Sequence, residues 1–321
     1  MQVATLDGMV AVTHFSDPGC PWAYSASPAH AVLRWRYREQ LQWRLVVIGL
    51  TEQADQYLRR GYTPAKSARG YLRFRKRGMP FATQPRERIS ATGLACRAIV
   101  ATRLHAPEYE DAVFRALQFG WFTTPLVFDE PRGLLEALGR IDGFDAEAIV
   151  AQLDDPAVEA AYQADRAEAR TAEGSPTHAQ GKHAQSDGPV RYTAPSLIFA
   201  SGGRRLEAGG FQPVEAYDVL LANLDPTLER TPPPEDPLEI LQALPDGLVT
   251  AEVAAVMAGN NEAPDPEAAE AALIDLVGDG SVIRRSLGDD ALWQPTAHAR
   301  NGSDPGRTAS DRVPGALHTA Q

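Results

Sequence analysis

The chain has 321 residues, a net charge of −11 at pH 7, and 44% of its residues are hydrophobic. It contains no apolar run of about 18 residues, so the sequence predicts no membrane span. Its two cysteines are too few for a disulfide framework. Because the first residues lack a basic, cleavable leader pattern, the expected location is the cytoplasm.

The first third of the chain predicts a strand, a helix and a second strand. Residues 10–15 are mostly apolar and end in turn formers, as a buried strand does. Residues 21–40 have a helical pattern that Pro28 is expected to disturb. Residues 41–50 alternate and then become fully apolar, which is typical of a central strand. The two strands of such a unit are expected to be parallel.

The middle of the chain predicts helices and then a hairpin. From about 52 to 170, apolar residues recur three and four positions apart, which predicts a large helical insertion. Residues 172–191 have no periodicity and many turn formers, and are expected to form a loop. Two strands, 194–200 and 204–210, and an amphipathic helix, 212–224, complete a predicted α/β domain over residues 1–229.

The last quarter predicts a separate module. Residues 230–237 contain three consecutive prolines, and we interpret them as a linker. Residues 238–296 read as three short helices followed by a hairpin, which is the element order of a winged helix, a small α+β fold. Residues 297–321 are rich in small and turn-forming residues, and this tail is expected to be disordered.

Charge is unevenly distributed along the chain. Residues 235–297 contain thirteen acidic and two basic side chains, whereas residues 34–103 contain sixteen basic and four acidic ones. Because phosphate contacts supply most DNA affinity, the acidic module is not expected to bind nucleic acid. We interpret it as a protein-interaction or packing module that can dock on the basic region. Three interpretations of the basic, aromatic stretch 59–78 remain open: a solvated face, a site for an anionic small thiol or partner near the pocket, and nucleic-acid binding.

The stretch "SDPGCPWAYS" carries the most specific chemistry. Cys20 follows a predicted strand and opens a predicted helix with Pro21 at its first position. The helix dipole and the unpaired N–H groups of the first turn stabilise a thiolate there, so we expect the pKa of Cys20 to be lowered. A buried, inert cysteine is the alternative.

This stretch, with the helical insertion and the ending "GGFQPVEAYDVLLANL", resembles the DsbA-like branch of the thioredoxin superfamily. It is most similar to the cytosolic FrnE-type proteins, whose motif is C-P-W-C, and the resemblance covers about residues 8–225. It implies a thioredoxin-like fold with Cys20, Pro21 and Trp22 at the active site. Kappa-class glutathione transferases and 2-hydroxychromene-2-carboxylate isomerases resemble the same branch but carry Ser at the Cys20 position.

The chain departs from that motif at Ala23, which occupies the place of the resolving cysteine. A mechanism that uses a disulfide between positions 20 and 23 is therefore excluded, and three hypotheses remain. The first is a thiol–disulfide oxidoreductase that uses Cys20 alone with glutathione or mycothiol as co-substrate. The second is a kappa-type transferase or isomerase that binds a small thiol, and the third is a non-enzymatic scaffold with a degenerate redox site. None of the three needs a tightly bound cofactor.

The resemblance nominates further site residues. It implies a cis-proline at Ala194-Pro195, close to Cys20, where the Ala194 backbone would pair with a bound thiol peptide. It also implies that Thr92 and Cys96 line the pocket, although Cys96 alternatively reads as a core residue or as a distant resolving thiol.

Three more side chains have two interpretations each. Asp17 is a turn former or a group that modulates Cys20, Trp22 is a cover for the thiol or plain core, and His14 is structural or catalytic. His178 and His183 have no third ligand near them in sequence, so no metal site is assigned.

Overall fold

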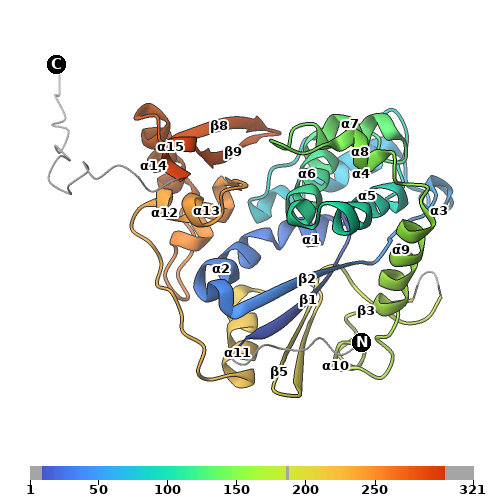
Figure 1. Ribbon diagram of the computed structural model, residues 1–321, viewed down its shortest axis with the longest axis horizontal. Coiled ribbons are helices and arrows are strands. Elements are labelled where there is room, and N and C mark those ends of the chain that lie inside the picture. The colour runs from blue at the N-terminus through green and yellow to red at the C-terminus, as the bar shows by residue number, and fades with distance from the viewer. Residues whose placement is uncertain (1–8, 186–187, 301–321) are drawn as a thin grey trace, which may run out of the picture.

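A four-stranded sheet forms the centre of the protein. The computed structural model describes residues 9–185 and 188–300. The strands lie in the order β2-β1-β5-β6, with β1 parallel to β2 and antiparallel to β5, and β5 and β6 form a hairpin (Figure 1). Their bounds are Val10–Ser16 (β1), Leu41–Val47 (β2), Ser196–Ser201 (β5) and Arg204–Gly209 (β6). The predicted β-α-β and β-β-α halves therefore meet in one sheet.

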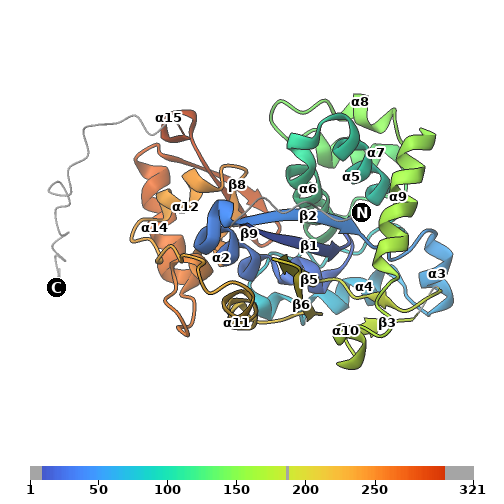
Figure 2. The same ribbon diagram turned by 60° about the horizontal axis from the view of Figure 1, so that its bottom comes forward.

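Helices connect these strands and bury one face of the sheet. Helix α11 (Val214–Leu224) follows β6 and lies beside α2 (Figure 2). Its buried side chains share a core with α2 and the sheet. That core includes Val12 of β1, Leu33 of α2, Phe199 of β5 and Leu221 of α11, all fully or almost fully buried. Successive side chains of β1 point to opposite faces of the sheet, and Val10 and Val12 therefore share the face that packs on this core.

The predicted helix over 21–40 is interrupted earlier than expected. It forms as α1 (Pro21–Ser25) and α2 (Ser27–Tyr37), followed by the 3₁₀ turn η1 (Arg38–Gln40). The N–H of Ala26 closes α1 by bonding to the carbonyls of Trp22 and Ala23. Pro28 lies in the first turn of α2, where its missing N–H has no intrahelical partner to lose. The break therefore lies at Ala26 rather than at Pro28.

The insertion between β2 and β5 is helical, as the apolar spacing predicts. Its helices are α3 (Ala54–Arg59), α4 (Pro64–Tyr71), α5 (Gly93–His105), α6 (Glu110–Thr123), α7 (Pro131–Leu138), α8 (Ala146–Val150) and α9 (Pro156–Ala169), with the 3₁₀ turns η2 (Arg75–Arg77) and η3 (Pro107–Tyr109). They build a large aromatic core in which Tyr24 of α1 stacks on Phe122 of α6, with ring centroids 4.7 Å apart. The insertion is thus packed against the start of α1.

The segment after α9 is only partly a loop. It contains a short helix α10 (Pro176–Ala179) and the paired two-residue strands β3 (His183–Ala184) and β4 (Arg191–Tyr192). Ser175 caps α10 by accepting the N–H of His178. The prediction of an irregular loop over 172–191 is wrong for these elements, because a four-residue helix and a two-residue ladder are too short to produce a periodic pattern.

The carboxy-terminal module contains a third sheet. Its elements are α12 (Pro237–Ala243), β7 (Leu248–Val249), α13 (Thr250–Met257), α14 (Pro266–Gly278), β8 (Val282–Leu287), β9 (Asp290–Pro295) and α15 (Ala297–Arg300), and its sheet order is β7-β9-β8. The three helices and the hairpin are present in the predicted order, and β7 is an addition. The identification as a winged helix stays a prediction. Residues 297–300 are helical rather than disordered, and the rest of the predicted tail, 301–321, lies outside the described residues.

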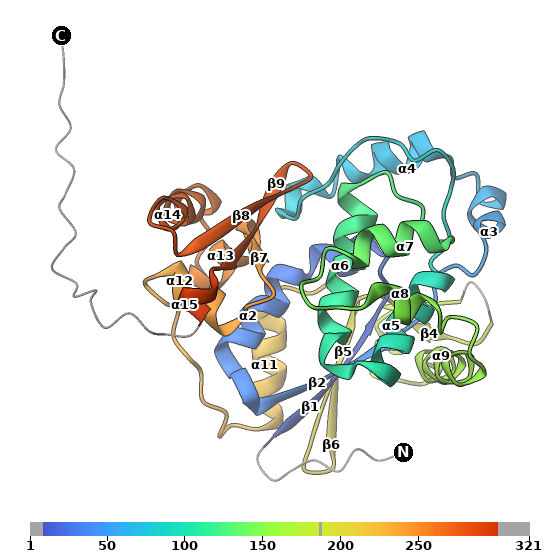
Figure 3. The ribbon, with the colours of Figure 1, turned by 45° about the horizontal axis from the view of Figure 1, so that its top comes forward.

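The module packs directly on α2. Val32 and Trp35 of α2 share a hydrophobic cluster with Leu241, Val253 and Leu273 of the module. In Figure 3 the tip of the β8–β9 hairpin reaches toward the segment after α4. There Asp289 forms an ion pair of 3.0 Å with Arg75, a residue of the basic stretch 59–78.

The linker is also held on α2. The indole N–H of Trp35 donates to the carbonyl of Pro232 at 2.8 Å, and the N–H of Thr231 donates to the carbonyl of Arg36 at 2.8 Å. Among the described residues, no helix has the length and apolarity needed to cross a membrane.

Candidate active site

Cys20 lies where β1 gives way to α1. Its extended backbone makes it the N-cap of α1, its N–H donates to the carbonyl of Asp17 at 3.1 Å, and Pro21 follows at the start of the helix. The carbonyl of Cys20 accepts the N–H of Tyr24 at 3.0 Å and closes the first turn. The local sequence therefore places the sulfur beside the free N–H groups of a helix start.

The start of β5 lies against the Cys20 sulfur. The Ala194–Pro195 peptide bond is cis, and the Cys20 thiol donates a hydrogen bond of 3.2 Å to the carbonyl oxygen of Ala194. Ser196, the next residue, pairs with Phe15 near the end of β1. The pairing of β5 with β1 thus brings together two segments 174 residues apart.

Burial determines the protonation of Cys20. The residue is 7% exposed, and this desolvation raises its pKa to about 11. The N–H groups of Ala23 and Trp22 and the charge of Arg191 act in the opposite direction, and the charge of Asp17 adds to the increase. The expected lowered pKa is therefore wrong, because the loss of hydration outweighs the helix start.

Asp17 is the polar centre beneath this turn. One of its carboxylate oxygens accepts the N–H of Gly19 at 2.9 Å, and the other accepts the N–H of Leu50 at 2.7 Å and the hydroxyl of Thr92 at 3.1 Å. The thiol of Cys96 also donates to Asp17 at 3.6 Å. Burial raises the pKa of Asp17, although these hydrogen bonds oppose the increase. Asp17 therefore acts as a turn former that joins the Cys20 loop to α5.

The second cysteine belongs to the core of the insertion. Cys96 is fully buried with Ala95 and Ile99 of the same helix, and burial raises its pKa well above the ordinary value. Both cysteines are free thiols. The structure connects Thr92 and Cys96 to the active-site turn through Asp17, while their roles toward a substrate stay predictions.

Trp22 lies on the surface rather than in the core. Its indole is 43% exposed and makes edge contacts with Phe74 and Phe211, with ring centroids 5.0 and 5.7 Å away. The guanidinium of Arg77 lies over both Trp22 and Phe211, at 4.6 and 4.4 Å from the ring centroids. The plain-core interpretation of Trp22 is therefore wrong, because the indole forms an aromatic–cationic rim next to Cys20.

A cationic cavity opens beside this rim. Its volume is about 540 Å³, and Gly19, Pro21 and Trp22 form one wall. Five basic side chains and, within the described residues, no acidic side chain line it: Arg60, Lys66, Arg73, Arg86 and Arg88. The basic stretch 59–78 thus contributes to the surroundings of Cys20. The sequence alone signalled the charge of this stretch but did not show that it lies next to the cysteine.

Three histidines with other possible roles lie elsewhere. His14 is buried on β1 and contacts His30 rather than Cys20, with ring centroids 4.7 Å apart. His178 and His183 stand edge to face at 4.5 Å. In the part of the chain that the structure describes, no three His, Cys, Asp or Glu side chains come together in a way that could hold a metal ion.

Comparisons with known proteins identify the fold. No protein-family model and no curated protein matches the chain. A solved structure of a candidate protein disulfide isomerase from Nitrosomonas europaea matches with a TM-score of 0.50 and 19% identity, over 67% of this chain and 97% of the other.

Two further matches are of one protein. The cytosolic disulfide reductase DsbM from Pseudomonas aeruginosa matches with a TM-score of 0.46 and 22% identity, over 67% of this chain and 98% of its own. The same protein with GSH matches with a TM-score of 0.45 and 18% identity, over 67% and 98%.

Proposed function

We propose that this chain, which has the DsbA-like form of the thioredoxin fold, is a thiol–disulfide oxidoreductase that works through Cys20 alone. The proposal rests on one arrangement: the Cys20 sulfur lies at the start of α1, 3.2 Å from the Ala194 carbonyl and beside the cationic cavity. A thiol at a helix start is a recurrent nucleophile. The cavity next to it provides space for a substrate.

The reaction requires only one sulfur of the protein. The Cys20 thiolate attacks a disulfide R–S–S–R′, so that a Cys20–S–S–R bond forms and R′S⁻ leaves. A second small thiolate then attacks the R sulfur, which releases the Cys20 thiolate and a new disulfide. No group at position 23 can carry out that second step, because Ala23 has no sulfur. The small thiol is both reductant and resolving agent.

The charge of the cavity favours an anionic small thiol. Arg60 and Arg73 form no ion pair with any described residue, and no acidic side chain lines the cavity within the described chain. Glutathione carries two carboxylates and one ammonium group, whereas mycothiol carries no carboxylate. We therefore propose glutathione as the co-substrate and treat mycothiol as the competing outcome of the test. The same argument makes acidic cysteine-containing peptides suitable disulfide substrates.

The pKa of Cys20 determines the conditions of the reaction. With a pKa raised to about 11 by burial, the resting thiol is neutral at pH 7 and bonded to the Ala194 carbonyl. A substrate that competes for that carbonyl frees the thiol from its resting contact. We expect attack by Cys20 to accelerate as the pH rises toward 11.

Mass spectrometry tests the proposal. Incubation with glutathione disulfide at pH 8.5 is expected to add one glutathione per chain, located at Cys20 by peptide mapping. Cys20→Ser should abolish the adduct, and the matched Cys96→Ser variant should keep it. A loss of two protons without an adduct would show that Cys20 and Cys96 have bridged, and the monothiol mechanism would then be wrong. Faster labelling by mycothiol disulfide would reverse the choice of thiol.

The burial of Cys20 favours a second candidate, a non-enzymatic interaction protein. The acidic module would then supply the function, since Glu267 and Asp275 of α14 are exposed beside the exposed apolar Ile274 and Val277. Such a surface fits a protein partner with a basic, apolar face. Complete resistance of Cys20 to glutathione disulfide at pH 8.5, in a folded protein, would favour this candidate over the enzyme.

A further inference from the structure

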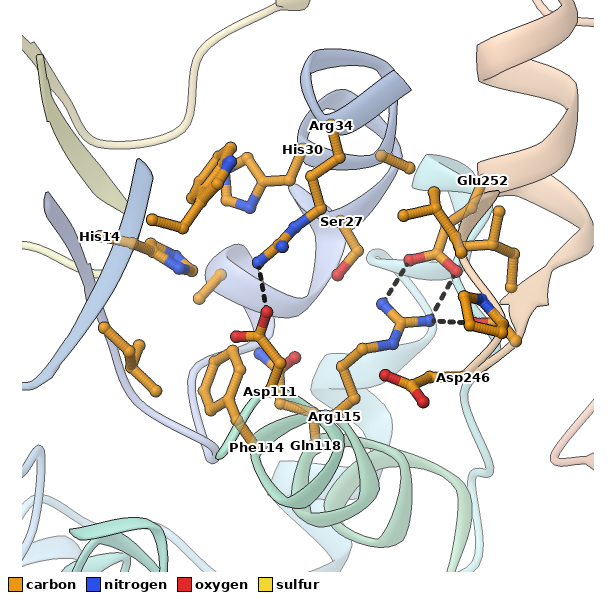
Figure 4. A pocket seen from close by; sticks show the side chains of 18 of the residues that line it. His14, Ser27, His30, Arg34, Asp111, Phe114, Arg115, Gln118, Asp246 and Glu252 are labelled. Atoms are coloured by element: carbon orange, nitrogen blue, oxygen red, sulfur yellow. Dashed lines mark hydrogen bonds and ion pairs between the residues drawn. The ribbon is translucent and has the colours of Figure 1, made fainter. Parts of the chain in front are cut away.

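A second cavity lies where three parts of the chain meet, and it shares no lining residue with the cationic cavity (Figure 4). Its volume is about 270 Å³. The walls come from β1, β2, α1 and α2, from α6 of the insertion, and from residues 243–248 and Glu252 of the module. The predicted domains and their linker gave no signal for it, because its residues are far apart in sequence.

Buried polar atoms without a hydrogen-bond partner line this cavity. Within the described residues they are His14 Nε2, His30 Nε2 and Trp43 Nε1. The side chains of Ser27 and Gln118 also line the cavity, and these two residues are 8% and 3% exposed. Figure 4 shows the Ser27 hydroxyl directed into the space between Arg34 and Arg115. Buried polar groups are normally satisfied, and leaving one unpaired costs about 1–3 kcal/mol.

The charged side chains around the cavity already balance one another. Arg115 makes two hydrogen bonds to Glu252, at 2.8 and 2.9 Å, and one to the Gly247 carbonyl at 3.1 Å. Arg34 forms an ion pair of 2.8 Å with Asp111. Of the two remaining charged lining residues, Arg44 forms an ion pair with Glu168, and Asp246 is exposed.

The two histidines add no charge. Burial, with Arg34 nearby, lowers the pKa of His14 to about 3, and burial lowers the pKa of His30 well below the ordinary value. Both rings are therefore neutral at pH 7. An anionic ligand would have to break an existing ion pair, and a cationic ligand would meet only the exposed carboxylate of Asp246, whose charge solvent screens.

Flat rings form much of the apolar wall. The His14 ring stands edge-on to Phe114 at 5.9 Å and to Trp43 at 6.3 Å, and His30 lies 5.8 Å from Trp43. Aromatic walls with a few convergent polar groups are typical of small-molecule sites. The neutral imidazoles, the hydroxyl and the amide each offer both a donor and an acceptor.

We propose that this cavity binds an uncharged, planar aromatic or heteroaromatic molecule whose amide-like edge pairs with Ser27 and Gln118. The flat part of the molecule lies against Trp43, Phe114 and the imidazoles. Because the walls belong to three parts of the chain, the bound molecule stabilises the packing of the module on α2 and α6. This site is independent of the reaction at Cys20.

Three isosteric probes test the charge argument. Benzamide, benzoate and benzamidinium have the same planar shape and carry charges of zero, minus one and plus one. By calorimetric titration at pH 7.5, benzamide is expected to bind with a Kd on the order of 1 mM, and the two charged probes at least tenfold more weakly. Prior alkylation of Cys20 should leave benzamide binding unchanged, which separates this site from the proposed reaction.

Variants of one wall locate the site. Gln118→Met keeps the side-chain volume and removes both hydrogen-bonding groups, so it should weaken benzamide binding at least fivefold. The matched control, Gln163→Met on the exposed face of α9, should not change it. Thermal unfolding verifies that both variants are folded. The proposal is wrong if none of the probes binds, which would mean a cavity that holds water only, if a charged probe binds best, or if Gln118→Met binds benzamide like the unmodified chain.

Discussion

The reactivity of Cys20 against pH is the most direct test of how this site is built. Its thiol pKa is about 11, against an ordinary value of 9.0, because burial outweighs the N–H groups at the start of α1. Two pKa units mean about one hundredfold less thiolate at pH 7. Only about one molecule in ten thousand then carries the reactive form.

The assay is alkylation by iodoacetamide between pH 7 and 9.5, with the Cys20 peptide quantified by mass spectrometry. The rate for the folded protein should rise about tenfold per pH unit over the whole range, since the thiolate fraction does so below the pKa. The same chain unfolded in urea is the control, and its rate should level off near pH 9. A plateau below pH 8.5 in the folded protein would refute the reasoning, because it would mean that the helix start outweighs burial.

Three further predictions concern other parts of the structure. Ala23→Cys should form an internal disulfide with Cys20 and create dithiol activity; titration of free thiols under oxidant should then find one, Cys96, and three persisting free thiols would refute the prediction. Glu252→Ala should lower the free energy of unfolding by about 3–5 kcal/mol in urea titrations, because it removes a fully buried carboxylate and leaves the partly buried guanidinium of Arg115 without its charged partner; a loss below about 1 kcal/mol would show that water reaches the pair. His14 has a folded pKa of about 3, below the ordinary 6.5, so the unfolded chain takes up the proton first and stability falls as the pH drops through that window. At pH 5 this shift lowers the free energy of unfolding by about 2 kcal/mol relative to neutral pH. The free energy of unfolding of His14→Gln, measured by urea titration at each pH, should therefore fall less steeply between pH 7 and 5. An equally steep fall in the variant and the unmodified chain would exclude His14 as the cause.

The sequence predicts local features of this protein well. The strand before Cys20, Pro21 at the helix start, and the 3–4 spacing of the insertion are all encoded by neighbouring residues. The resemblance to proteins with the C-P-W-C motif supplied the prediction that Pro195 is a cis-proline close to Cys20. Each of these features depends on contacts within a few turns of the chain or on a known pattern.

What the sequence could not predict comes from long-range packing. The protonation of Cys20 depends on its burial with Val190, Tyr192 and Ala194, which the pairing of β5 with β1 brings from the far end of the domain. The neutral state of His14 and His30 likewise depends on neighbours from other elements. No periodicity in the sequence reports which side chains lose their water.

The apolar face that α2 presents to the module has a consequence for how the chain folds. Ala31, Val32 and Trp35 are buried by residues that follow the proline linker, so cutting the chain after residue 229 would expose them to solvent. The amino-terminal part alone would then carry an exposed apolar patch on α2, and such patches promote self-association. The module and α2 should melt together, as one cooperative transition. During synthesis, the core between α2 and the module therefore cannot form until the residues after the proline linker have left the ribosome.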